Sequence, residues 1–221
     1  MIPAALSALS DLFSPAFRTV LLKAVALSLV LFVAVFLGVE WAISAFVGLP
    51  WPWLDTVVRV AAGLGLIAAF FFLMSPVTAL FAGLYLDEIA ALVEAKHYPQ
   101  DRPGVPLNTV TALLTGLQFA GLVLLVNLLV LPTVFLGVGV AVILTANAYL
   151  LGREYFELIA MRHMPVAEAR RLRRENRLHV WTAGFAPAAW ALVPFVNLAV
   201  PLFATAYFVH VFKRLAPARA Q

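Results

Sequence analysis

The residue best suited to binding a ligand is Arg18, at the start of the first long apolar stretch of the chain. The first turn of a helix presents free N–H groups and the positive end of the helix dipole, and both favour an anion. A guanidinium adds two parallel hydrogen bonds to a tetrahedral oxyanion. Arg18 is therefore a candidate oxyanion ligand, and the alternative is an anchor that contacts lipid phosphate.

Lys23 follows Arg18 by five residues and lies inside the same apolar stretch. A lysine in such a place keeps its stem in apolar surroundings and turns its amine toward water. Lys23 is thus either a second ligand for the same anion or a membrane anchor.

Arg153 and Glu154 come directly after an uncharged run of fifty residues, Pro103 to Gly152. Charged side chains at the end of so apolar a segment either line a polar path or cap a helix at the membrane surface. Both interpretations stay open from the sequence.

Pro194, Asn197 and Pro201 lie within the last apolar block of the chain. A proline lacks an N–H group and breaks a helix, which leaves carbonyl groups unpaired. The side chain of Asn197 is suited to satisfy such a group. All three residues are therefore candidates for a structural or path-lining role.

The sequence argues against several other kinds of chemistry. The chain has no Cys, which excludes disulfides, thiolate catalysis and Cys-ligated zinc. Its four His show no metal-ligand spacing, and we find neither a Ser, His and Asp grouping nor a glycine-rich phosphate loop. We therefore expect no enzyme activity, no metal and no cofactor. The basic residues are not spread like a nucleic-acid patch, so the expected partners are membrane lipids and an anion.

Composition places these residues in a membrane. Of the 221 residues, 64% are hydrophobic and 12% are charged, whereas soluble domains carry about 25% charged residues. Because lipid forces backbone groups to pair within a segment, the apolar runs are expected to be helices. The fold class is an all-α integral membrane protein that forms a single membrane domain over residues 1–221.

The apolar and charged runs divide this domain into two long transmembrane helices and two hydrophobic helical hairpins. The first hairpin is divided at Pro132, where a helix should break. In the second, residues 180–193 would extend only about 21 Å as a helix, less than the ~30 Å hydrocarbon core, so we expect it to be re-entrant with its tip near Pro194. The predicted elements are an interfacial helix (1–15), long helices (18–48 and 54–98), a hairpin (108–152), charged cytoplasmic helices (153–178) and a hairpin (180–213).

The orientation follows from the basic residues. Only the segment Trp41 to Arg59 is expected on the far side, and fourteen of the fifteen Lys and Arg lie on the near side. The positive-inside rule makes that side cytoplasmic, with both termini there. Glu40 and Arg59, near the outer ends of the two long helices, either pair with each other or lie at the interface.

One motif resembles a known family. Residues 194–201 read Pro-Phe-Val-Asn-Leu-Ala-Val-Pro, which is similar to the P-x-x-N-L-x-x-P signature of the CysZ-type sulfate permeases, a family that includes the etoposide-induced membrane proteins of eukaryotes. Arg153-Glu-Tyr-Phe156 before an Arg-rich helix and Gly184, and Ser75-Pro76 before a helix with Glu88 and Glu94, follow the order of the family.

The resemblance implies two long membrane helices, two half-penetrating hairpins, assembly into a homo-oligomer and sulfate passage without an ATP site. Sulfate would bind near the start of the first long helix, at a Gly-Leu-Arg motif. This chain reads Pro15-Ala16-Phe17-Arg18 there, so the Arg matches while the Gly and Leu do not, and the anion could differ from sulfate.

We therefore expect an inner-membrane transporter or channel for the uptake of sulfate or a similar oxyanion. The alternative is a membrane scaffold or assembly factor of the same broad family that transports nothing. A membrane enzyme is the least supported class, because no catalytic constellation is found.

Overall fold

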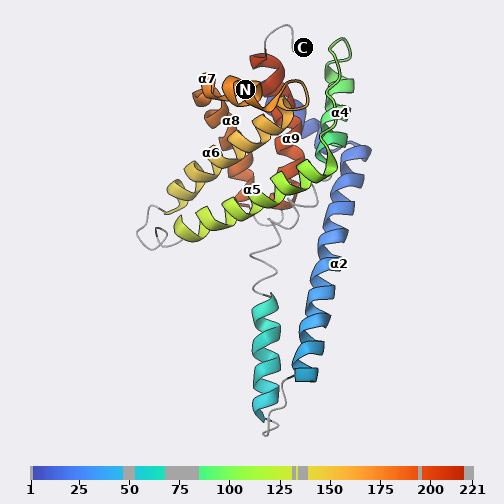
Figure 1. Cartoon of the computed structure of the whole chain (residues 1–221), viewed down its shortest axis with the longest axis vertical. Helices are drawn as coiled ribbons and strands as arrows, with labels where there is room; N and C mark the ends of the chain where they lie inside the picture. Colours follow the sequence, from blue (N-terminus) through green and yellow to red (C-terminus); the bar gives the residue numbers. More distant parts are fainter. Residues whose placement is uncertain are drawn as a thin grey trace.

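Two long helices project from a helical body in the computed structural model of the chain (Figure 1). The structure describes residues 2–46, 53–67, 85–130, 133, 139–193 and 196–216, and within these ranges the regular elements are all helices. Helix α2 (Pro15–Phe46) and the helix 53–67 form the projection, which we call the arm. The body contains α1 (Ile2–Leu12), α4 (Leu86–His97), α5 (Thr109–Val130), α6 (Gly139–Ala160), α7 (Val166–Glu175), α8 (Arg177–Ala191), η2 (Val196–Ala199) and α9 (Val200–Leu215).

Helix α2 has the length and surface of a membrane helix. Its 32 residues extend about 48 Å, more than the ~30 Å hydrocarbon core of a bilayer. Its segment Pro15–Ile43 is, among the described residues, the one helix long and apolar enough to cross a membrane. Most of its large side chains are exposed, including Val30, Val33 and Leu37. An apolar surface of this extent is favourable in lipid and unfavourable in water.

An ion pair joins the two helices of the arm far from the body. The Arg59 guanidinium lies 3.5 Å from the Glu40 carboxylate and 2.9 Å from the Asp55 carboxylate. The pairing of Glu40 with Arg59 that the sequence left open is therefore present, and it neutralises Arg59 at the distal end of the arm.

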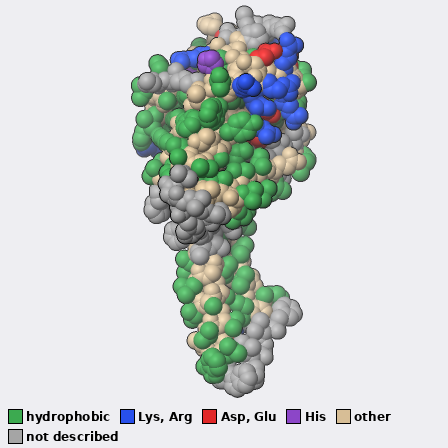
Figure 2. Space-filling view, turned by 90° about the vertical axis from the view of Figure 1, so that its left-hand side faces the viewer, with side chains coloured by type: hydrophobic (Ala, Val, Ile, Leu, Met, Phe, Trp, Pro, Cys, Tyr) green, Lys and Arg blue, Asp and Glu red, His purple; other side chains and the backbone are tan. Residues whose placement is uncertain are grey.

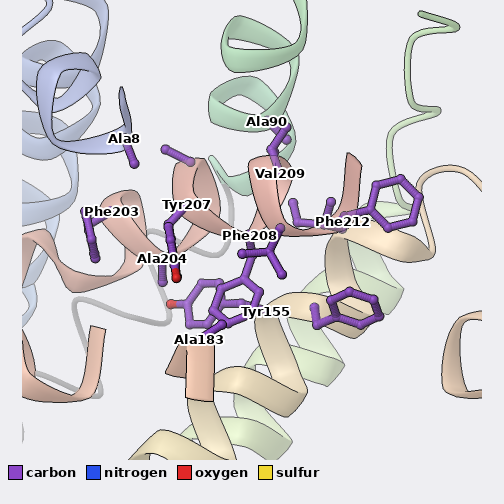
Figure 3. Packing of buried hydrophobic residues seen from close by; sticks show 14 of the residues in the cluster. Ala8, Ala90, Tyr155, Ala183, Phe203, Ala204, Tyr207, Phe208, Val209 and Phe212 are labelled. Atoms are coloured by element: carbon purple, nitrogen blue, oxygen red, sulfur yellow. The ribbon is translucent and has the colours of Figure 1, made fainter. Parts of the chain in front are cut away.

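Helix α9 is the centre of the body. Every residue from Val200 to Lys213 is buried, as expected of a helix that is apolar on nearly all sides. Figure 3 shows Tyr207 and Phe208 of α9 beside Tyr155 of α6, with Ala183 of α8 nearby. The rings of Tyr155 and Phe208 stack with their centroids 6.4 Å apart.

Helices α6 and α8 form the most extensive helix pair of the body. Their backbones touch, because a Cβ at Gly184 would overlap the carbonyl oxygen of Ala148, and a Cβ at Gly152 would lie 2.5 Å from the carbonyl oxygen of Val180. Small residues that allow such close approach are typical of helix interfaces in membranes. The Gly184 noted in the sequence thus has a packing role.

Some predicted boundaries differ from the structure. The charge pattern places a helix end at Gly152, whereas α6 continues to Ala160. The physical reason is that Tyr155, Phe156 and Ile159 are buried in the core, so the segment gains more from packing than the charges of Arg153 and Glu154 cost. The long helix predicted over 54–98 is described only at 53–67 and from Tyr85 onward; its middle, with Ser75-Pro76, lies outside the described residues, as does Pro132.

We expect Gly184→Ala to lower the unfolding midpoint of the purified protein in detergent. The added Cβ meets backbone rather than a movable side chain, so α6 and α8 must separate, at a typical overpacking cost of about 1–3 kcal/mol.

Gly121→Ala in α5 is the matched control, because nothing lies within 4 Å of its Cβ position. Equal midpoints for Gly184→Ala and the parent protein would show that the two helices are not held in backbone contact.

Candidate functional site

The start of α2 is anchored to the body by two apolar side chains. Phe17 is 3% exposed and Val20 is 1% exposed, and both belong to the core. A turn precedes the helix, in which the Ser14 N–H donates to the carbonyl oxygen of Asp11 over 2.9 Å. The Arg18 N–H then donates to the carbonyl oxygen of Ser14 over 3.1 Å. The position of the first turn of α2 is therefore fixed by packing and by backbone hydrogen bonds.

Arg18 points away from this anchored face. Its side chain is exposed, and it makes no hydrogen bond or ion pair with any residue that the structure describes. Pro15 has no N–H group, so the donors that precede Arg18 in the first turn are those of Ala16 and Phe17, which have no partners within the helix. A guanidinium and backbone N–H donors thus occur together at the N-terminus of α2, and both kinds of donor bind oxyanions.

Lys23 is exposed too, but it has a different neighbour. Its ammonium lies 5.9 Å from the ring centre of Tyr85, within cation–π range. Five residues of helix rotate the side chain by about 140°, so Arg18 and Lys23 do not share a face of α2. Lys23 therefore contacts the start of α4, and its roles as a ligand or as a membrane anchor stay predictions.

Arg153 and Glu154 lie within α6 and are half-buried. The Nε atom of Arg153 is buried and has no hydrogen-bond partner among the described residues. One turn further along α6, Glu157 pairs with Arg173 of α7 at 2.5 Å and with Arg170 at 3.5 Å. The charged end of α6 therefore binds α7, and Arg153 is a half-buried cation one turn before that contact.

The tip of the α8–α9 hairpin lies beside the first long helix, because η2 contacts α2. The Asn197 N–H donates to the carbonyl oxygen of Val193 over 3.1 Å. The carbonyl oxygen of Pro201 accepts a 2.7 Å hydrogen bond from the Thr205 hydroxyl. Pro194 lies outside the described residues. Asn197 and Pro201 thus lie between α8 and the first turn of α9, where hydrogen bonds pair backbone groups of both residues.

A buried ion-pair network joins α4 to the end of α6. We call Asp87, Glu94, Gly104, Arg162 and His163 the Glu94 cluster. The Arg162 guanidinium pairs with Asp87 and, at 3.2 Å, with Glu94. The other oxygen of Glu94 lies 3.0 Å from Nε2 of His163, and the Gly104 N–H donates to the carboxylate over 3.1 Å.

The electrostatics of Glu94 follow from these contacts. Burial of its carboxyl on its own would raise the pKa, but the hydrogen bond with His163 and the charge of Arg162 outweigh burial and lower the pKa to about 2. Glu94 is therefore ionised at neutral pH. The loop after α4 donates two backbone hydrogen bonds to the cluster: the Gly104 N–H to Glu94, and the Val105 N–H to the carbonyl oxygen of Arg162 over 2.8 Å. The cluster thus fixes that loop to the body.

A second polar network connects α1, α4 and α9. We call Asp11, Lys96, His97, Tyr98 and His210 the Asp11 cluster. The Asp11 side chain is 2% exposed and accepts a 2.6 Å hydrogen bond from Lys96. The Nε2 atom of His97 lies 3.0 Å from Asp11, and the Tyr98 hydroxyl lies 2.8 Å from Nδ1 of His210.

Neither cluster was predicted from the sequence, because their members are far apart in the chain: Asp11 and His210 are separated by 199 residues (210 − 11). A signal for Glu94 was present: it follows the apolar residues Ile89, Ala90 and Val93 on an amphipathic segment, so its carboxylate had to be buried with a cation. The spacing of the four His gave no such signal, since His97 and His210 come from different helices.

The charged side chains gather at one end of the molecule. Figure 2 shows Lys and Arg over the upper part of the body and hydrophobic side chains over the arm. The exposed arginines of this end include Arg170, Arg171 and Arg174 of α7. In the described part of the arm beyond the body, Arg59 is the one basic residue, and it is paired. The body therefore has a cationic end, and the arm is apolar.

An apolar arm and a cationic body, helical throughout the described residues, are typical of membrane proteins, and comparison with known proteins places the chain in a family. The model of the family described as sulfate transporter CysZ/etoposide-induced protein 2.4 matches residues 4–201, or 198 of the 221 residues. The chain belongs to this family, and the resemblance seen in residues 194–201 is confirmed. Family membership and the apolar helix α2 together indicate a membrane protein. No curated protein sequence matches the chain.

Acid is expected to destabilise the protein through Glu94. A carboxyl whose pKa falls from 4.5 unfolded to about 2 folded contributes its full stabilisation above pH 4.5 and loses it as the pH falls toward 2. The contribution is on the order of 3 kcal/mol. It is measured as the unfolding midpoint in detergent between pH 6 and pH 3.

Glu94→Gln should lower the midpoint at pH 6 and reduce its dependence on acid, since the titrating group is gone. Glu175→Gln removes an exposed pair with Arg171 and should change little. An acid dependence that is identical in Glu94→Gln and the parent protein would contradict this account.

Proposed function

We propose that the chain is an inner-membrane transporter or channel that mediates the uptake of sulfate or a similar oxyanion. The observation that carries the proposal is Arg18: an exposed guanidinium without a partner among the described residues, at the anchored start of the membrane helix of a family described as sulfate transporters. The chain needs no nucleotide for passive passage of an anion.

The surface of the molecule supports a particular placement in the membrane. Beyond Lys23 the arm would cross the bilayer, because its exposed side chains there are mostly apolar and Glu40, Asp55 and Arg59 pair with one another. The cationic end would face the cytoplasm, in agreement with the positive-inside rule. The α5–α6 and α8–α9 hairpins would enter the membrane from that side and return to it.

The apolar surface of helix α5 is consistent with a hairpin in the membrane and with assembly into an oligomer. It exposes Leu114, Leu117, Leu125 and Leu129, and its residues 109–130 contain no Asp, Glu, Lys or Arg. Such a surface has to be covered by lipid or by another copy of the chain. We therefore propose that the protein is a homo-oligomer whose subunits and lipids share the apolar surfaces of α2 and α5.

The anion would bind first at the start of α2. A doubly charged oxyanion sheds water when it enters the membrane, so fixed donors have to replace that water. Arg18 supplies a two-pronged donor, and the first turn of α2 supplies N–H groups. The cationic surface of α7 would raise the local anion concentration, and the half-buried Arg153 is a second candidate contact along the path.

We expect Arg18→Ala to bind sulfate about tenfold to a thousandfold more weakly than the parent protein. Charged hydrogen bonds contribute about 1.5–3 kcal/mol each, and 1.4 kcal/mol corresponds to a factor of ten. Titration calorimetry of the purified protein with sulfate, chloride and phosphate measures the effect.

Arg18→Lys should restore only part of the affinity, because an ammonium cannot form the two parallel bonds. Arg174→Ala on α7 removes an equally exposed arginine and should leave the dissociation constant nearly unchanged. Unchanged sulfate affinity in Arg18→Ala would move the site elsewhere. Absence of sulfate binding by the parent protein would favour the scaffold function.

The placement in the membrane predicts which positions react from outside. The chain has no Cys, so single cysteines report on one position each. Trp53→Cys at the start of the second arm helix should react with an impermeant thiol reagent in intact cells, while Val193→Cys and Val196→Cys at the hairpin tip should not.

All three positions are exposed on the isolated molecule, which makes Trp53→Cys the internal control for the two tip variants. Labelling of Val193→Cys and Val196→Cys as complete as that of Trp53→Cys would mean that the second hairpin crosses the membrane fully.

A further inference from the structure

The Asp11 cluster contains three groups of the kind that bind transition metals. Asp11, His97 and His210 each offer one ligand atom, and these three atoms lie within 4.8 Å of one another. They come from α1, α4 and α9, which are far apart in the sequence. Two imidazoles and one carboxylate form a donor set that suits zinc and related divalent ions.

His210 provides a second, independent observation. Its residue is 5% exposed, and its Nε2 atom is buried without a hydrogen-bond partner among the described residues. A buried ring nitrogen left without a partner costs free energy that a folded protein normally avoids. The imidazole is also fixed in place, because Tyr98 binds its Nδ1 atom at 2.8 Å and the His97 ring packs edge-on at 4.9 Å.

The neighbours of the three groups resemble the outer contacts of metal sites. Lys96 binds one oxygen of the Asp11 carboxylate at 2.6 Å, while the other oxygen lies 3.0 Å from His97. Tyr98 orients the His210 ring through the nitrogen that would not face a metal bound at Nε2. Such outer hydrogen bonds orient ligands and strengthen binding.

We propose that Asp11, His97 and His210 bind one divalent ion of the zinc type, which fastens α1 to α4 and α9. Metal–ligand bonds of about 2.0–2.2 Å put tetrahedral ligands about 3.4 Å apart, so the three atoms have to move together only slightly. The ion replaces the contact between His97 and Asp11. Lys96 is compatible with the ion, since it binds Oδ1 of Asp11 and leaves Oδ2, the oxygen nearer His97, for the metal.

The fourth coordination position belongs to a water molecule or to an anion, because the described residues supply three ligands. The site ties down the N-terminal helix directly before the turn that leads to Arg18. Binding of the metal is therefore expected to hold the start of α2 in place. This role requires neither sulfate binding nor transport, so the two proposals succeed or fail separately.

The test uses the full-length protein, purified in detergent without a polyhistidine tag and stripped with a chelator. Zn²⁺ binding is measured by competition with a chromophoric chelator, and Co²⁺ is added in parallel as a spectroscopic probe. We expect one saturable site per chain and the visible absorption bands of tetrahedral Co²⁺. Zn²⁺ should also raise the unfolding midpoint.

Variants of the ligands and of their neighbours are expected to weaken Zn²⁺ binding to different extents. His97→Ala, with the least buried of the three ligands, should weaken Zn²⁺ binding by more than the roughly 10–100-fold that loss of an outer hydrogen bond costs. Asp11→Asn should behave similarly, and Tyr98→Phe should fall within that 10–100-fold range. His179→Ala is the matched control, because His179 is exposed on α8 and should bind Zn²⁺ like the parent protein.

Two results would overturn the proposal. The first is that the parent protein shows no saturable Zn²⁺ binding, which would make the cluster an ion-pair network only. The second is that folded His97→Ala, judged by circular dichroism and its elution from a sizing column, binds Zn²⁺ as tightly as the His179→Ala control.

Discussion

The body of this protein depends on the complete burial of one helix, α9. A buried helix needs partners on every side, and α1, α4, α6 and α8 all pack on it. Near its C-terminus α9 also buries two polar side chains, His210 and Lys213. Tyr98 binds the first, and Asp101 lies 2.9 Å from the second. The same contacts that complete the core thus draw the loop after α4 onto α9.

Burial of α9 explains why the polar residues of the body occur in clusters. Charges inside a protein persist only when they are paired and hydrogen-bonded. Glu94 therefore holds Arg162, His163 and the Gly104 N–H at once. The arm differs from the body: most of its large apolar side chains are exposed, and Arg59 is paired with Glu40 and Asp55. Arg18, which is exposed and has no ion-pair partner among the described residues, lies in the arm at its junction with the body.

The sequence predicted what depends on composition and local pattern. The apolar run after Arg18 predicted the helix α2, and the motif in residues 194–201 predicted the family. Both signals are contiguous in the chain. It did not give the end of α6 at Ala160, which follows from burial of Tyr155 and Phe156 against α9. Nor did it give the partners of Glu94 and Asp11, which depend on how distant helices pack.

The central claim is that this chain lets sulfate or a similar oxyanion cross a membrane. Flux of radiolabelled sulfate into liposomes that contain the purified protein tests this claim most directly. The account predicts uptake above that of protein-free liposomes and competition by unlabelled sulfate. Sulfate flux no greater than in protein-free liposomes, with the protein shown to be folded and inserted, would contradict it.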